Sequence, residues 1–185
     1  MPNWCNNSVT LRHKDPAMIQ RAQEALASGT LLNEFFPCPA ELHEHDSPIR
    51  DEALSERFLK EYGAKDWYDW QVKNWGTKWD VGTDGLMQRL DEHTLEASFD
   101  SAWAPPTAAY EKLTDLGFYV KAYYNEPGMC FCGVWEGDKD NGFFDDYVEY
   151  SGETSATIRE AVGEELDDYW GLSETMAEYE EEESE

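Results

Sequence analysis

The sequence predicts an α+β protein in which helices pack against an antiparallel sheet. Segments of alternating apolar and polar residues, the pattern of half-buried strands, are bounded by turn residues. Between them lie segments with apolar residues at helical spacing. The chain has 185 residues, of which 41% are hydrophobic, and it contains 8 Trp, 10 Tyr and 8 Phe. Because this is enough apolar material for one core, we expect a single domain over residues 1–172.

The N-terminal part predicts a strand followed by a helix. Residues 4–13 alternate loosely, as a strand does. Asp15 can cap a helix and Pro16 suits its first position, while Gly29 is placed to end it. Residues 31–42 contain several prolines, so a packed loop is expected there.

The next part, at about residues 46–82, is predicted to be a helical insertion rich in tryptophan. A helical pattern runs from Pro48 to Leu59 and breaks at Gly63. Four of the eight tryptophans follow: Trp67, Trp70, Trp75 and Trp79. A stacking platform for single strands or sugars is one interpretation, but the carboxylates of Asp66, Asp69 and Asp80 offset Lys73 and Lys78. A tryptophan-rich plug of the core is the preferred interpretation.

The C-terminal half predicts most of the sheet and an acidic helix. Strands are expected at residues 94–101, 118–124, 129–136 and 143–150, with a short helix that ends at Gly117. The sheet would then have about four or five strands. Residues 155–170 predict one helix with an anionic outer face, and residues 173–185 predict a disordered acidic tail.

Charge is the most unusual property of the chain. It has 14 Lys and Arg against 40 Asp and Glu, a net charge of −26. Residues 136–185 hold 19 acidic and 2 basic residues, a net charge of −17. The aromatic content argues against disorder as the explanation. Such a field excludes nucleic-acid binding through phosphate contacts and suits a partner that itself binds nucleic acid. The alternative is that the acidic face only keeps the protein in solution.

We therefore expect a basic nucleic-acid-binding protein of a bacterial host as the partner, with no direct contact to nucleic acid or membrane. The candidate contacts are acidic residues of the C-terminal third: Asp138, Asp140, Asp145, Asp146, Glu149, Glu160, Glu164, Asp167 and Asp168.

The sequence offers little support for catalysis, a metal or a cofactor, and none of the three is expected. It has no catalytic triad order, zinc-protease motif or phosphate-binding glycine loop. A free amine at Pro2 is a possible nucleophile, but a simple lead into the first strand is the better interpretation. Residues 138–146 resemble a calcium loop only faintly, and Asn141-Gly142 favours a hairpin turn.

Cysteine usage and hydropathy predict a cytoplasmic protein. No signal peptide and no membrane-spanning apolar run are found. Four cysteines, Cys5, Cys38, Cys130 and Cys132, are too few and too scattered for a disulfide framework and lack zinc-site spacing. Buried free thiols are expected.

Five motifs resemble one family. They are Met1-Pro2-Asn3-Trp4-Cys5-Asn6-Asn7, the run from Tyr62 to Trp70, Asn74-Trp75-Gly76-Thr77-Lys78-Trp79, Trp103-Ala104-Pro105-Pro106, and Tyr124-Asn125-Glu126-Pro127-Gly128-Met129. Together they are similar to the phage and plasmid YubB-type family and cover most of residues 1–135. The resemblance implies a mobile-element origin and a ferredoxin-like sheet, but no activity or catalytic residue.

Two functional hypotheses follow. In the first, the protein inhibits a host defence complex, such as a CRISPR effector or a restriction system, by occupying its nucleic-acid-binding surface as a DNA mimic. In the second, the protein is a binding module or small enzyme whose acidity serves solubility. The tryptophans Trp67, Trp70, Trp75, Trp79 and Trp103 would then line a ligand pocket.

Overall fold

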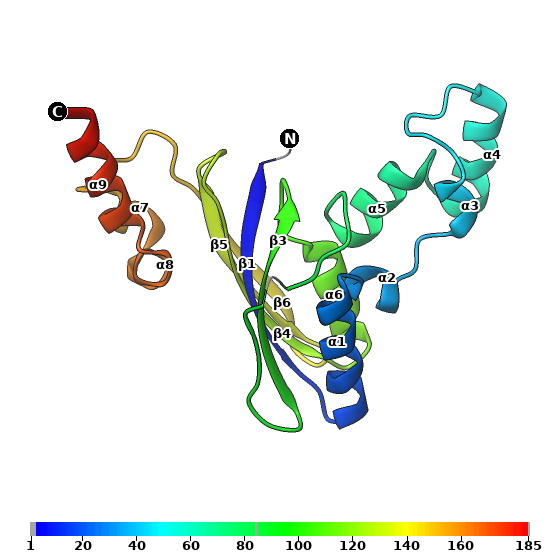
Figure 1. The fold of residues 1–185 in the computed structure, drawn as a ribbon, viewed down its shortest axis with the longest axis horizontal. Coiled ribbons are helices and arrows are strands. Elements are labelled where there is room, and N and C mark those ends of the chain that lie inside the picture. Colours follow the sequence, from blue (N-terminus) through cyan, green and yellow to red (C-terminus); the bar gives the residue numbers. More distant parts are fainter. Residues whose placement is uncertain (1–2, 84, 185) are drawn as a thin grey trace.

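The computed structural model describes residues 3–83 and 85–184, and it contains a six-stranded antiparallel sheet with helices packed on it (Figure 1). The α+β prediction is confirmed. The order of the strands across the sheet is β2-β3-β1-β4-β5-β6. Their bounds are β1 Trp4–Arg12, β2 Met87–Arg89, β3 Thr94–Ala102, β4 Tyr119–Glu126, β5 Phe131–Asp138 and β6 Gly142–Glu149.

The helices lie between and after these strands. They are α1 Pro16–Ser28, α2 Leu31–Phe35, α3 Ala40–His43, α4 Glu52–Tyr62, α5 Trp67–Trp75, α6 Thr107–Asp115, α7 Ile158–Val162, α8 Glu164–Trp170 and α9 Leu172–Ser184. None of these helices is long and apolar enough to cross a membrane.

The first four strands form a ferredoxin-like unit. The elements β1, α1, β2, β3, α6 and β4 follow one another as β-α-β-β-α-β, with β1 between β3 and β4 in the sheet. Strands β5 and β6 extend this unit beyond β4. The sheet has six strands because the three-residue β2 pairs with β3 from Met87 to Arg89. A strand this short gives no alternating pattern.

Each face of the sheet packs on its own core. In β1, Cys5, Val9 and Leu11 face the first core, which α1 and α6 cover. On the other face of β5, Cys132 and Val134 contribute to a second core covered by α7, α8 and α9. Figure 1 shows α7–α9 on one side of the sheet and α1, α2 and α6 on the other. The acidic C-terminal third is therefore anchored to the β4–β6 end of the sheet.

The insertion between α1 and β2 is helical from an earlier point than predicted. Residues 31–42, expected as a packed loop, contain α2 and most of α3. The carboxylate of Asp80 accepts hydrogen bonds from the backbone N–H groups of Leu32 (2.7 Å) and Asn33 (3.0 Å), and so holds the first turn of α2. This contact joins residues 48 positions apart and gives no local sequence signal.

The C-terminal helices also differ from the prediction. The single helix expected over residues 155–170 is wrong, because Gly163 adopts φ 84° and ψ 158° and separates α7 from α8. The segment expected as a disordered tail forms α9 as far as Ser184, and Glu185 lies outside the described residues. Helix α9 is tied back by Glu180, whose carboxylate accepts from the N–H and hydroxyl of Ser155.

Candidate functional site: the acidic C-terminal surface

Five of the nine predicted contacts lie on the β5–β6 hairpin. Asp138 ends β5, Asp140 lies in the turn, and Asp145, Asp146 and Glu149 lie on β6. Strand β6 is an edge of the sheet, and all of its residues except the half-buried Val148 are exposed. Exposed aromatic rings of Phe143, Phe144 and Tyr147 alternate with these carboxylates. The hairpin therefore presents both negative charge and apolar area to solvent.

Asp138 shapes the turn of this hairpin. Its carboxylate accepts from the N–H groups of Asp140 (2.8 Å) and Asn141 (2.9 Å) and from the Asn141 side-chain amide. Hydrogen bonds from Asn141, first from its side chain and then from its N–H, lower the pKa of Asp138. The hairpin interpretation of residues 138–142 is confirmed, since Asp138 pairs with Gly142.

Asp145 has a buried partner. Its carboxylate accepts a 2.6 Å hydrogen bond from the hydroxyl of Tyr124, a fully buried residue of β4. The Tyr124 ring crosses β5 at Gly133, where an added Cβ would lie 2.3 Å from the hydroxyl. Partial removal from water raises the pKa of Asp145, and the Tyr124 hydrogen bond opposes that rise.

The contacts predicted on the C-terminal helix are divided between α7 and α8, and Arg159 pairs with three of them. Its guanidinium lies 2.8 Å from Glu164 and 2.9 Å from Asp167, and it also contacts Asp168. Glu160 on α7 is exposed and its carboxylate has no partner among the described residues. The α7–α8 segment is therefore less negative toward a partner than its composition suggests.

Asp167 is not available to a partner. Its side chain is 1% exposed, and besides Arg159 it accepts from the N–H (2.8 Å) and hydroxyl (2.9 Å) of Ser173 in the first turn of α9. Burial alone would raise its pKa, but the hydrogen bonds from Ser173 and Arg159 outweigh burial and lower it. Asp167 was expected to be a surface contact, and this expectation is wrong because the chain turns at Gly171 and lays α9 over it.

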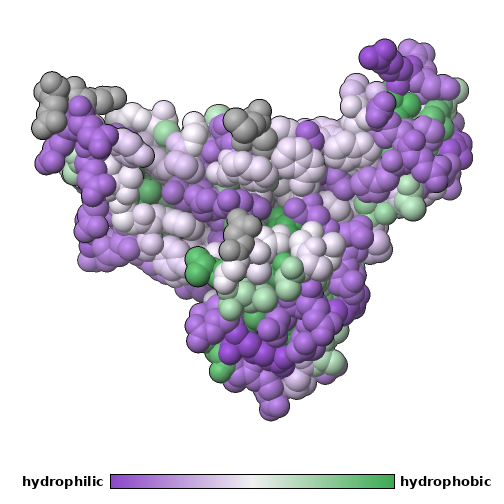
Figure 2. Space-filling model, viewed as in Figure 1, coloured by the Kyte–Doolittle hydropathy of each residue, from purple (hydrophilic) through white to green (hydrophobic). Residues whose placement is uncertain are grey.

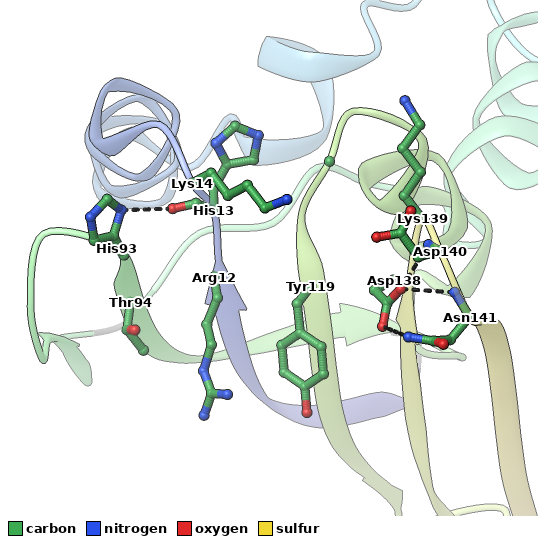
Figure 3. A pocket seen from close by; sticks show the side chains of 11 residues that line it. Arg12, His13, Lys14, His93, Thr94, Tyr119, Asp138, Lys139, Asp140 and Asn141 are labelled. Carbon is green, nitrogen blue, oxygen red and sulfur yellow. Dashed lines mark hydrogen bonds between the residues drawn. The ribbon is translucent and has the colours of Figure 1, made fainter.

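Sequence reasoning missed a cavity, lined by several charged residues, where β1, β3 and β4 meet the β5–β6 turn (Figure 3). Its volume is about 800 Å³, and the cations Arg12, Lys14 and Lys139 line it together with Asp138 and Asp140. The Arg12 guanidinium lies 5.0 Å from the centre of the Tyr119 ring. The sequence did contain one sign of this site: Lys139 is one of only two cations in the acidic third of the chain.

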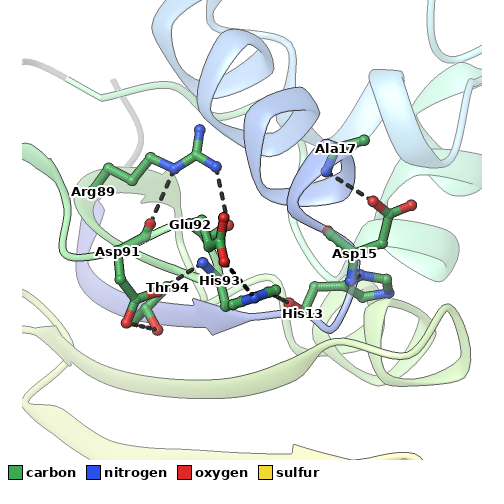
Figure 4. A network of polar contacts seen from close by, with 8 residues as sticks. All are labelled: His13, Asp15, Ala17, Arg89, Asp91, Glu92, His93 and Thr94. Atoms are coloured by element: carbon green, nitrogen blue, oxygen red, sulfur yellow. Dashed lines mark hydrogen bonds and ion pairs between the residues drawn. The ribbon is translucent and has the colours of Figure 1, made fainter.

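The two histidines at this cavity have structural partners (Figure 4). The N–H of Asp15 donates to Nδ1 of His13 (2.9 Å), which assigns the ring proton to Nε2, 3.2 Å from the Leu116 carbonyl. Nδ1 of His93 lies 3.0 Å from the carbonyl of His13 and donates to it. These bonds orient both rings, and Nε2 of His93 lies 3.3 Å from the carboxylate of Glu92.

The cysteines and tryptophans divide between core and surface. Burial raises the pKa of Cys5 and of Cys132 to about 12, so these thiols stay protonated. No group of three or more metal-ligating side chains occurs in residues 3–83 and 85–184, and Pro2 lies outside them.

Trp75 is buried in the first core, and Trp67 and Trp70 pack against it. Trp79 and Trp103 are exposed, so the five tryptophans do not line one pocket.

The fold and this surface define an α+β protein with a ferredoxin-like sheet and an acidic C-terminal end. No protein-family model and no curated protein matches the chain. The solved structures include a distant neighbour, the protein api92 from Yersinia pseudotuberculosis, described with family model DUF1281. It is 11% identical, with a TM-score of 0.45, and the match covers 83% of this chain and 99% of that one. The resemblance to the YubB-type family stays a prediction.

Proposed function

We propose that the protein is a mobile-element inhibitor that binds the basic, nucleic-acid-binding surface of a host defence complex in place of DNA. A CRISPR effector or a restriction complex in the bacterial cytoplasm is the expected target. One observation carries the proposal: most carboxylates of the β5–β6 hairpin and of α7–α9 are exposed, with only Lys139 and Arg159 as cations among them. Figure 2 shows that the described surface of α9 is almost entirely hydrophilic.

The carboxylates best placed to bind a partner are those that have no hydrogen-bond or ion-pair partner within the described part of the chain. The side chains of Asp140, Asp146 and Glu160 are exposed and make no hydrogen bond or ion pair among the described residues. Their charges are thus free for a Lys or Arg groove. Such complementarity gives fast, steered association that weakens as salt screens it.

The test is a charge reversal with a matched control. The triple variant Asp140→Lys, Asp146→Lys, Glu160→Lys changes the net charge by the same amount as Glu44→Lys, Asp46→Lys, Glu56→Lys, which alters exposed residues of the insertion. Each protein is titrated into purified CRISPR effector and restriction complexes, and inhibition of their DNA binding is measured at low and physiological salt.

We expect the wild type and the insertion variant to compete with duplex DNA for at least one complex, and the hairpin and α7 variant to lose at least about tenfold in affinity, or 1.4 kcal/mol. Equal loss in both variants would show that only net charge matters. That result, or the absence of competition in every complex tested, would overturn the proposal.

A further inference from the structure

A second surface, outside the acidic third, brings together motifs that the proposed function does not use. Trp4 begins β1, Lys78 and Trp79 follow α5, and Trp103 follows β3, yet their side chains meet. The Trp4 and Trp79 rings lie 5.8 Å apart, and Trp103 lies edge-on to Tyr68 at 6.2 Å. We call Trp4, Tyr68, Lys78, Trp79 and Trp103 the indole surface. Its three tryptophans are 45%, 38% and 41% exposed in chain order.

Two hydrogen bonds hold the segments that form this surface. The Thr77 hydroxyl donates to the Ala102 carbonyl (3.0 Å) inside the protein, and the Trp103 N–H donates to the Asn3 carbonyl (2.9 Å). Gly76 has φ +87°, and a Cβ there would lie 3.0 Å from the Thr107 N–H nitrogen. Only glycine allows the loop to lie this close to α6. The glycine and the threonine of this motif are therefore explained by the close approach of the loop to α6 and to the end of β3.

Trp103 has an unfavourable backbone conformation. Its φ of +67° lies in the left-handed region, which bulky residues rarely adopt. Residues held in this region cluster at functional sites. A core role does not account for the conformation, because the ring is substantially exposed.

Lys78 supplies an uncompensated positive charge at the centre of the indole surface. Its ammonium lies 4.7 Å from the ring centre of Trp79, 5.2 Å from Trp103 and 5.7 Å from Tyr68. It makes no ion pair with any carboxylate in the described parts of the chain. This isolation is notable in a protein with a net charge of −26.

Two of the carboxylates expected to offset Lys78 are used elsewhere. Asp66 is buried, caps α5 through the Asp69 N–H (2.9 Å) and accepts from the Ser47 hydroxyl. Asp80 holds the first turn of α2. Asp66 and Asp80 therefore do not neutralise Lys78, and a stacking platform is compatible with this surface.

We propose that the indole surface binds a small ligand that combines a planar aromatic ring with an anionic group, the chemistry of a nucleoside monophosphate. The ring stacks on an exposed indole, and the phosphate pairs with Lys78. A cationic ligand fits less well, since Lys78 already fills the position among the rings. A long nucleic-acid strand is repelled by the charge of the remaining surface.

Calorimetric titration and NMR of the indole N–H groups test this proposal with adenosine 5′-monophosphate as the probe. Adenosine, inorganic phosphate and cellobiose are titrated in parallel. We expect the monophosphate to bind at least about fivefold more tightly than adenosine or phosphate, a difference of about 1 kcal/mol. Shifts should be confined to the N–H signals of Trp4, Trp79 and Trp103.

Two variants separate the ring from the charge. Lys78→Gln should weaken monophosphate binding about fivefold or more without changing adenosine binding. Lys65→Gln, at an exposed lysine of the same insertion, should change neither monophosphate binding nor adenosine binding. Trp103→Gly removes a ring at a backbone position that glycine favours, so it should lose binding while the thermal midpoint shows that the fold is kept. The proposal is overturned if the monophosphate does not bind, if cellobiose binds more tightly, or if Lys78→Gln binds like the wild type.

Discussion

Asp167 and Asp168 are adjacent residues with opposite environments. Both contact Arg159, but the Asp168 side chain is 62% exposed and that of Asp167 is 1% exposed. Asp167 also holds Ser173 at the start of α9. One buried carboxylate therefore joins α8 to the start of α9.

We predict that Asp167→Ala lowers the free energy of unfolding by about 1–3 kcal/mol, because it leaves the Ser173 N–H and the Arg159 guanidinium without their partner. Asp168→Ala is the matched control, and its cost should stay below about 1 kcal/mol, the value of an exposed ion pair. Urea unfolding at pH 7 measures both. Similar losses in the two variants would contradict the role assigned to Asp167.

Sequence periodicity could not distinguish these two aspartates. The predicted helix over residues 155–170 placed both on a solvated outer face, and the contact to Ser173 forms only because Gly171 has φ +62° and redirects the chain. Lys78 shows the same limit. Its neighbours in the sequence suggested neutralisation, but Asp66 also accepts from Ser47, 19 positions away, and Asp80 accepts from Leu32, 48 positions away.

At the scale of elements, the β4–β5–β6 end depends on a glycine in the middle strand. Gly133 leaves room for the Tyr124 ring to reach Asp145 across β5. The edge strand is thus linked to the first core by a side-chain hydrogen bond as well as by its backbone ladder with β5. The alternation of apolar and polar residues predicted β4, β5 and β6 well. It could not predict the break at Gly163, which depends on backbone conformation, or the short β2, which depends on pairing with β3.

The partial removal of Asp145 from water gives a pH dependence. The pKa of Asp145 is raised in the folded state by removal from water, so its contribution to stability is complete below the unfolded pKa and is lost as pH rises through the folded pKa. Asparagine does not titrate. Asp145→Asn should therefore gain stability relative to the wild type between about pH 4 and pH 7, by less than about 1 kcal/mol because the residue is partly exposed.

Urea unfolding at both pH values measures this difference. Asp146→Asn is the control, because it removes a charge from the next residue of β6, which makes no hydrogen bond to a tyrosine. A pH dependence of equal size in the two variants would show that general charge repulsion, and not the partial removal of Asp145 from water, sets the effect.

At the scale of the whole molecule, self-repulsion acts on every element. Fourteen cations cannot balance 40 carboxylates, and the sequence alone showed this excess and its concentration in residues 136–185. It could not show which carboxylates the fold neutralises. Arg159, Lys121 and the N–H groups of helix starts and turns account for several of them.

We predict that raising NaCl from about 20 mM to about 500 mM increases the thermal midpoint by about 2–8 °C, since the screening length falls severalfold and repulsion is worth about 1–2 kcal/mol. KCl should act equally, because screening does not depend on a specific cation. A midpoint that falls with either salt would mean that attractive pairs outweigh repulsion.

The open edge at β6 has a consequence for self-association. An unpaired edge strand with exposed aromatic rings is a template for pairing with another copy of the chain. Antiparallel pairing of two β6 strands would place Asp145, Asp146 and Glu149 of one copy near the same residues of the other. The carboxylates thus oppose fibre growth through the pairing of two β6 edges, because like charges would face one another.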